Sequence, residues 1–192
     1  MSDLKHDPVI NAIQKGIKDD IDFNLRAERF RATLILIYAA IDAMAFLNMP
    51  ATQSDVTRKD FIDWAERYLK FPCKTQLSGS DLYGARCGIL HTYSLQSKMS
   101  REGKCRMFFH VNNIPGDPVR DIGHPQYILV SIVGLKTALF AAIDCFLVYV
   151  FASVQKAKVV ESRLKKLLIK YEDLPGTDPH LRPFLEGHLL IT

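Results

Sequence analysis

The sequence predicts a mainly α-helical fold, an up-and-down bundle of four to six helices that carries a short two-stranded β insertion. Three observations predict it. Apolar residues recur at helical spacing through most of the chain, glycine and proline concentrate between residues 100 and 126, and an aromatic-rich run lies inside that stretch. With 192 residues, 48% of them apolar, the chain suits one domain with a single core.

The first two helices are predicted over residues 8–22 and 25–47. Pro8 suits an early helical position, and apolar residues recur every four positions from Val9. The second helix is apolar on nearly every face, which predicts a central place in the bundle. It ends before Pro50, because proline disfavours a helical conformation in the residue that precedes it.

Two capping signals predict where the next helices begin. Asp60 follows Thr57 by three residues, and Asp81 follows Ser78 by the same interval. At this spacing a hydroxyl and a carboxylate cap a helix N-terminus reciprocally. The third helix should therefore start after Thr57, and the fourth should start after Ser78 and run to about Gln96.

Residues 100–126 interrupt the helical pattern with three glycines and three prolines. Residues 105–111 are typical of a strand, and residues 127–130 either pair with it as a second strand or begin the following helix. A long helix is predicted from about residue 131 to residue 170, with a break near its middle as an alternative.

We expect a single domain over residues 1–172, with residues 100–126 inserted in it, and an irregular tail over residues 173–192. The four cysteines form no CxxC pair, which indicates reduced thiols. The first residues contain no apolar run behind a basic cluster, so no secretory signal is expected. These features favour a cytoplasmic protein.

Two long apolar runs, residues 32–49 and 127–154, raise the question of a membrane. Asp42 interrupts the first run, and Lys136 and Asp144 interrupt the second. A charge at the centre of a bilayer costs roughly 3 kcal/mol even on lenient scales, so we expect buried helices and no membrane contact. The tetrapeptide Ala-Ala-Ile-Asp ends at Asp42 and again at Asp144, and each carboxylate should face a cation, because burying it unpaired is costly.

The stretch from Arg86 to Tyr93 is the candidate site of chemistry. Gly84 and Gly88 each cost the fourth helix about 1 kcal/mol relative to alanine, which suggests close approach of another helix or of a ligand. Arg86 offers a permanent charge suited to phosphate, and His91 can exchange a proton near neutral pH. Together they suffice to cleave RNA without a metal, because one group removes the 2′-OH proton while a cation stabilises charge on the phosphate oxygens.

Helix geometry restricts how these two side chains can meet. Five residues of straight helix place Arg86 and His91 about 140° apart. They can share a face only if the long arginine side chain wraps round the helix or if the helix is distorted at Gly88.

The sequence RCGILHTY, from Arg86 to Tyr93, resembles the Arg-x4-His-x-Tyr motif of the HEPN superfamily (higher eukaryotes and prokaryotes nucleotide-binding domain). The resemblance covers the helices between residues 8 and 155. It implies a metal-independent ribonuclease with no cofactor, in which Arg86 and His91 are catalytic, and a homodimer whose cleft draws groups from both copies. Asp42, Cys87 and Tyr93 would support them. Many active members carry Asn, Asp or His where this chain has Cys87.

Structural roles remain open beside the functional ones. Arg86 can instead form a buried ion pair with Asp42 or Asp144, and His91 and Tyr93 can be packing residues. A zinc site at Cys87, His91, Cys105 and His110 lacks the close ligand spacing typical of zinc proteins, so no metal is expected. A basic run near the end of the last helix is either a solvated face or a guide for RNA phosphates; its candidate RNA-binding residues are Lys156, Lys158 and Arg163.

The leading hypothesis is therefore a HEPN-type endoribonuclease that cleaves RNA by transesterification. The alternative is a non-catalytic helical interaction or nucleotide-binding module of the same fold, which Cys87 favours. The resemblance also implies a stress, toxin–antitoxin or phage-defence setting, with an antitoxin or a nucleotidyltransferase as partner.

Overall fold

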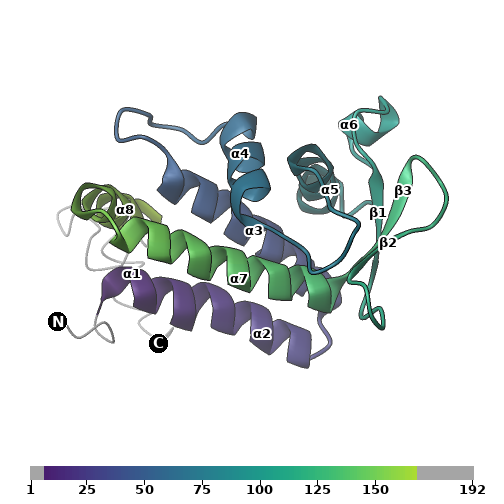
Figure 1. Cartoon of the computed structure of the whole chain (residues 1–192), viewed down its shortest axis with the longest axis horizontal. Helices are drawn as coiled ribbons and strands as arrows, with labels where there is room; N and C mark the ends of the chain where they lie inside the picture. Colours follow the sequence, from purple (N-terminus) through teal and green to yellow (C-terminus); the bar gives the residue numbers. More distant parts are fainter. Residues whose placement is uncertain (1–6, 168–192) are drawn as a thin grey trace, which may run out of the picture.

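The computed structural model describes residues 7–167, and it confirms a mainly helical fold with a short β insertion (Figure 1). The predicted tail beyond residue 172 and the end of the last helix lie outside the described residues. The first helix is continuous to Arg26. It comprises α1 (Pro8–Asn11), a π-helical stretch η2 (Ala12–Lys18) and α2 (Asp19–Arg26).

The central helix is α3 (Phe30–Asn48), as its apolar composition predicts. It packs against α2, α4, α5, α7 and α8. Ile37, Tyr38 and Ile41 on this helix have no solvent exposure. Burial of one such side chain contributes roughly 1.5–3 kcal/mol, so α3 supplies much of the core energy.

Helices α4 (Arg58–Tyr68) and α5 (Gly79–Thr92) begin where the capping signals predict. Both reciprocal caps are present, Thr57 with Asp60 and Ser78 with Asp81. The end of α5 was predicted near Gln96, and this is wrong. Tyr93 adopts a left-handed conformation with φ 51°, which ends the helix, and the N–H of Ser94 then donates back to the Gly88 carbonyl at 3.1 Å.

The chain then forms α6 (Lys98–Arg101) and a sheet of β1 (Met107–Val111), β2 (Val119–Asp121) and β3 (Tyr127–Ser131). The predicted pairing of the outer two segments is confirmed: β1 and β3 are parallel, with Met107 opposite Tyr127. The prediction of only two strands is wrong, because β2 adds an antiparallel edge to β3. The sheet lies at the end of the bundle where α7 begins (Figure 1).

The predicted long helix is broken, as one alternative expected, into α7 (Ile132–Phe151) and α8 (Val154–Leu167). Helix α7 runs antiparallel to the first helix (Figure 1), since Lys136 pairs with Asp22 at 3.0 Å and Asp144 with Lys18 at 2.6 Å. The expected cation opposite Asp144 is therefore Lys18. Lys18 is the buried partner, however, and the Asp144 side chain is 58% exposed.

Helices α3 and α7 are long and apolar enough to cross a membrane by length and composition alone. Half of the most apolar window of α3, and 44% of that of α7, is buried inside the protein. Three charged residues within them, Asp42, Lys136 and Asp144, each pair with a group from another helix.

Candidate functional site

The candidate site lies where α5 crosses α3, and Arg86 is its centre. The Nε atom of Arg86 donates to Oδ2 of Asp42 at 2.9 Å, and both side chains are more than three-quarters buried. Burial alone lowers the pKa of Arg86, but the hydrogen bond and charge of Asp42 outweigh it and raise that pKa. Burial is also the largest influence on Asp42 and raises its pKa, against the opposing effect of Arg86. Because a guanidinium stays protonated in proteins, its charge keeps this pair ionic at neutral pH.

His91 contacts the other end of the same guanidinium. Its Nε2 atom lies 3.0 Å from Nη1 of Arg86, and the residue is exposed in the last turn of α5. Arginine can only donate, so Nε2 must accept and the imidazole in this contact is neutral. The separation of about 140° is overcome by the length of the arginine side chain. The structure thus brings Asp42, Arg86 and His91 into one chain of contacts.

Two further side chains surround Arg86. The guanidinium lies 5.8 Å from the ring centre of Tyr83, close enough for a cation–π contact. The sequence reasoning missed Tyr83, although a residue three positions before Arg86 on a helix is its neighbour. Cys87 is half-buried, and its sulfur adds to the raised pKa of Arg86.

Gly84 and Gly88 of α5 have a different role from the one that we expected. A Cβ atom on Gly88 would lie 2.6 Å from the Ser94 carbonyl oxygen, and one on Gly84 would collide with the Cys105 sulfur. The chain's own segment of residues 94–105 therefore covers this face of α5. Neither a separate helix nor a ligand explains these glycines.

The residue that follows this segment, Arg106, is held to the start of α5 by an ion pair. Arg106 donates from its backbone N–H and from its guanidinium to Asp81, with Nη2 to Oδ2 at 2.6 Å. Asp81 also caps α5 and is 4% exposed. Burial alone raises the pKa of Asp81, but the hydrogen bonds from Arg106 and Ser78 outweigh it and lower that pKa overall.

Tyr93 is not a core aromatic, since it is 67% exposed. It lines a cavity of about 280 Å³ together with Ile89, Leu34 and His110. His110 meets the hydroxyl of the fully buried Tyr38 at 3.0 Å, and burial lowers the pKa of His110 to about 4. The ring is only half-buried as a whole, yet its Nδ1 is closed to solvent and has no partner within residues 7–167. His110 is therefore neutral, and its side-chain hydrogen bond is to Tyr38 and not to Arg86 or His91.

The three candidate RNA-binding residues on α8 differ in exposure. Lys156 donates to the Asn48 carbonyl at 2.6 Å, and Arg163, 6% exposed, donates to the carbonyls of Pro50 and Gln53. Both side chains thus hold α8 against the chain that follows α3. Lys158 is exposed.

Cys87, His91, Cys105 and His110 do not come together as metal ligands. Within residues 7–167, no group of three or more histidine, cysteine, aspartate or glutamate side chains is arranged to hold a metal ion. No family model matches the chain, and neither a curated protein nor a solved structure shows significant similarity to it.

Proposed function

We propose that this chain is a metal-independent endoribonuclease of the HEPN type. One observation carries the proposal: the guanidinium of Arg86 bridges the carboxylate of Asp42 and the imidazole of His91. This arrangement combines a fixed cation with a neutral base whose lone pair lies beside it. Those are the two groups that cleavage of RNA at its 2′-OH needs.

The proposed reaction follows from these positions. A phosphodiester would bind Arg86 through N–H groups not engaged by Asp42 and His91. His91 Nε2 has a single lone pair, so it would first have to release Nη1 of Arg86. It would then take the proton from the 2′-OH while the 2′ oxygen attacks phosphorus and the bond to the 5′ oxygen breaks. Arg86 would stabilise the charge gained by the phosphate oxygens. The products would be a 2′,3′-cyclic phosphate and a 5′-OH end, which requires an acid to protonate the leaving oxygen.

A homodimer would supply that acid. Each chain carries one His91, so a two-fold cleft would hold one histidine as base and one as acid. Since the glycine face of α5 is covered by residues 94–105, the cleft would have to use the exposed His91 side of the helix. RNA as substrate, a cytoplasmic location, and an antitoxin or nucleotidyltransferase partner in a defence setting belong to the same proposal.

Purified protein should cleave single-stranded RNA in excess EDTA, because the proposed chemistry uses only side chains. The 2′,3′-cyclic phosphate should make the products resistant to labelling by enzymes that need a free 3′-OH. Mass spectrometry should detect the cyclic phosphate directly. Cleavage that appears only after Mg²⁺ or Mn²⁺ is added would contradict the proposal.

Asp42→Asn should lower RNA cleavage about 10- to 100-fold, because loss of the charged partner lets Arg86 leave its catalytic position. The matched control is Asp144→Asn, which removes the same residue from the same tetrapeptide but leaves Arg86 paired. Initial rates of both variants, measured beside their thermal unfolding, separate positioning from folding. Equal activity in the two variants would show that Asp42 does not position Arg86.

The non-catalytic module remains the second candidate, and Cys87 is the observation that favours it. A protein that binds RNA or a nucleotide through Arg86 but leaves RNA intact under every metal condition would be such a module.

A further inference from the structure

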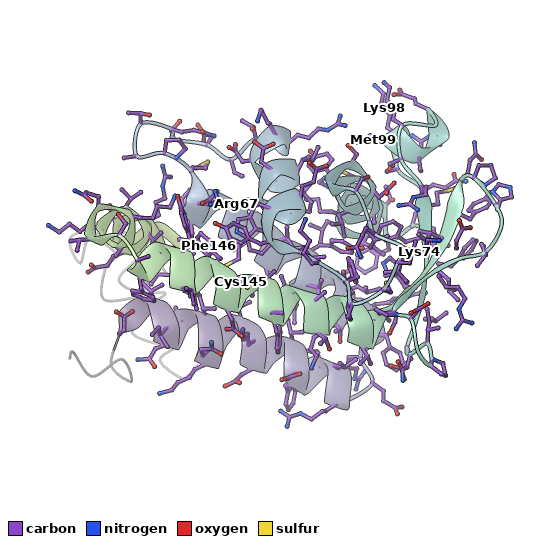
Figure 2. All side chains as sticks on the ribbon, viewed as in Figure 1. Arg67, Lys74, Lys98, Met99, Cys145 and Phe146 are labelled. Carbon is purple, nitrogen blue, oxygen red and sulfur yellow. The ribbon has the colours of Figure 1, made fainter. Side chains whose placement is uncertain are left out.

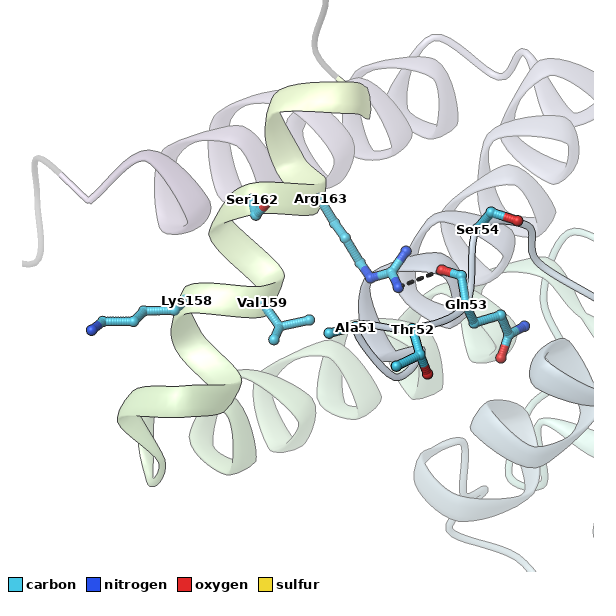
Figure 3. Close-up of a pocket in the computed structure, with 8 residues that line it drawn as sticks. All are labelled: Ala51, Thr52, Gln53, Ser54, Lys158, Val159, Ser162 and Arg163. Atoms are coloured by element: carbon cyan, nitrogen blue, oxygen red, sulfur yellow. Dashed lines mark hydrogen bonds between the residues drawn. The ribbon is translucent and has the colours of Figure 1, made fainter.

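A second cavity lies at the opposite end of α3 from the sheet, between α8 and the loop that follows α3 (Figure 3). Its volume is about 390 Å³. Lys158, Ser162 and Arg163 line it from α8, and Thr52 and Ser54 line it from the loop. The polar side chains are thus two cations, three hydroxyls and the amide of Gln53. No carboxylate is among the lining residues, and the Ser54 hydroxyl donates to Asp55 beside the cavity.

Among the residues that line this cavity, Arg163 is unusual because arginine is seldom so deeply buried. It is 6% exposed, and its Nη2 atom donates to the carbonyl oxygens of Pro50 and Gln53, the latter at 2.8 Å. Its Nε atom is buried with no acceptor within residues 7–167. A buried charge is normally balanced by an opposite charge, but no Asp or Glu in this part of the chain pairs with Arg163.

Neighbouring charges increase the need for an anion. Burial lowers the pKa of Lys156, and the positive charges of Arg163 and Arg67 lower it further. Within the described residues these three cations are held by carbonyl oxygens and by aromatic rings, with Arg67 and Lys156 against Tyr149 and Arg163 against Phe46. Carbonyls and rings offer only partial negative charge, so these cations repel one another and would attract an anion.

We propose that this cavity binds a phosphate group, as the free ion or as the monoester of a small ligand. Arg163 presents a planar guanidinium suited to phosphate oxygens. The exposed Lys158 side chain points away from Arg163 (Figure 3), and it would add a second charge by turning toward the cavity. The hydroxyls of Thr52 and Ser162 complete the set of donors around the cavity. The site lies on different elements from Arg86 and His91, so it does not depend on the proposed ribonuclease activity.

The test is the thermal stability of the full chain in increasing inorganic phosphate, with chloride adjusted to hold the ionic strength constant. Binding to the folded state should raise Tm in a saturable way. The double variant Lys158→Gln, Ser162→Ala should bind phosphate about tenfold more weakly, since it loses a charged and a neutral donor. Both residues are exposed, so this variant should fold normally. Adenosine 5′-monophosphate should also raise Tm by binding at the same site, and adenosine should not raise it.

The matched control is Lys98→Gln on α6, which lies at the end of the molecule that carries the sheet, while α8 lies at the other end (Figures 1 and 2). Lys98 is also an exposed lysine, and its variant should keep the wild-type phosphate response. Arg163→Met provides a second test: it should abolish the response even if it also lowers Tm. A wild-type protein without a saturable response, or equal responses in the double variant and the Lys98 control, would overturn the proposal. Stabilisation by adenosine equal to that by its monophosphate would overturn it as well.

Discussion

His91→Ala should lower the rate of RNA cleavage by about 10²- to 10⁴-fold, the usual contribution of a general acid–base group. The fold should tolerate the change, because His91 is exposed and its side-chain hydrogen bond within residues 7–167 is the one to Arg86. Initial rates on single-stranded RNA in EDTA, together with Tm, measure both effects. A large loss of Tm in this variant would indicate a packing histidine.

His124→Ala is the matched control, since His124 is an exposed histidine in the loop before β3 and should not affect cleavage. Mixed dimers of wild-type and His91→Ala chains test the shared cleft. If both histidines act in one cleft, every mixed dimer lacks one of them, and its activity should fall far below half. Mixed dimers with half the wild-type activity would contradict a shared cleft.

Asp81→Ala should lower the free energy of unfolding by about 3 kcal/mol, the lower end of the cost of breaking a buried ion pair. The substitution removes the cap of α5 and leaves Arg106 without its carboxylate. Urea unfolding at neutral pH measures the change. Asp63→Ala removes an exposed carboxylate that pairs with Lys59 one turn away, and this control should change stability little.

The effect of Asp81 should also depend on pH. Its pKa is lower in the folded protein than in an unfolded chain, where aspartate titrates near about 3.9. The stability that it contributes is therefore present above about pH 4 and is lost as the pH falls through the lowered folded-state pKa. The gap in unfolding free energy between wild type and Asp81→Ala should narrow in acid. A gap that stays constant down to pH 2 would show that the charge of Asp81 is not what stabilises α5.

Sequence signals that act within one helical turn predicted parts of the fold, whereas features that depend on tertiary contacts could not be predicted. The starts of α4 and α5 follow from hydroxyl–carboxylate pairs three residues apart, which act within a single turn. The end of α5 could not be predicted, because Tyr93 adopts a backbone conformation that the sequence does not favour for tyrosine. Strand β2 has three residues, too few to show an alternating pattern, and it exists through its pairing with β3.

The candidate site, too, could be predicted only in part from the sequence. A cation opposite Asp42 could be predicted, because a carboxylate in an apolar helix needs one. The contact between Arg86 and His91 could not, since angular spacing describes where side chains leave a helix and not how far an arginine reaches. Lys156 and Arg163 have the sequence pattern of a solvated face, and their bonds to Asn48, Pro50 and Gln53 arise only from tertiary packing.

Residues 94–105, which lie over Gly84 and Gly88, limit how this domain can be shortened or joined to other domains. Because the helix is without side chains at the two positions where residues 94–105 lie against it, the helix and this segment are complementary parts of one core. A shortened protein without residues 100–126 would lose the Cys105 contact and the Arg106 tether to Asp81. What looks in the sequence like an insertion into a minimal bundle is therefore an integral layer, and a working minimal domain has to retain it.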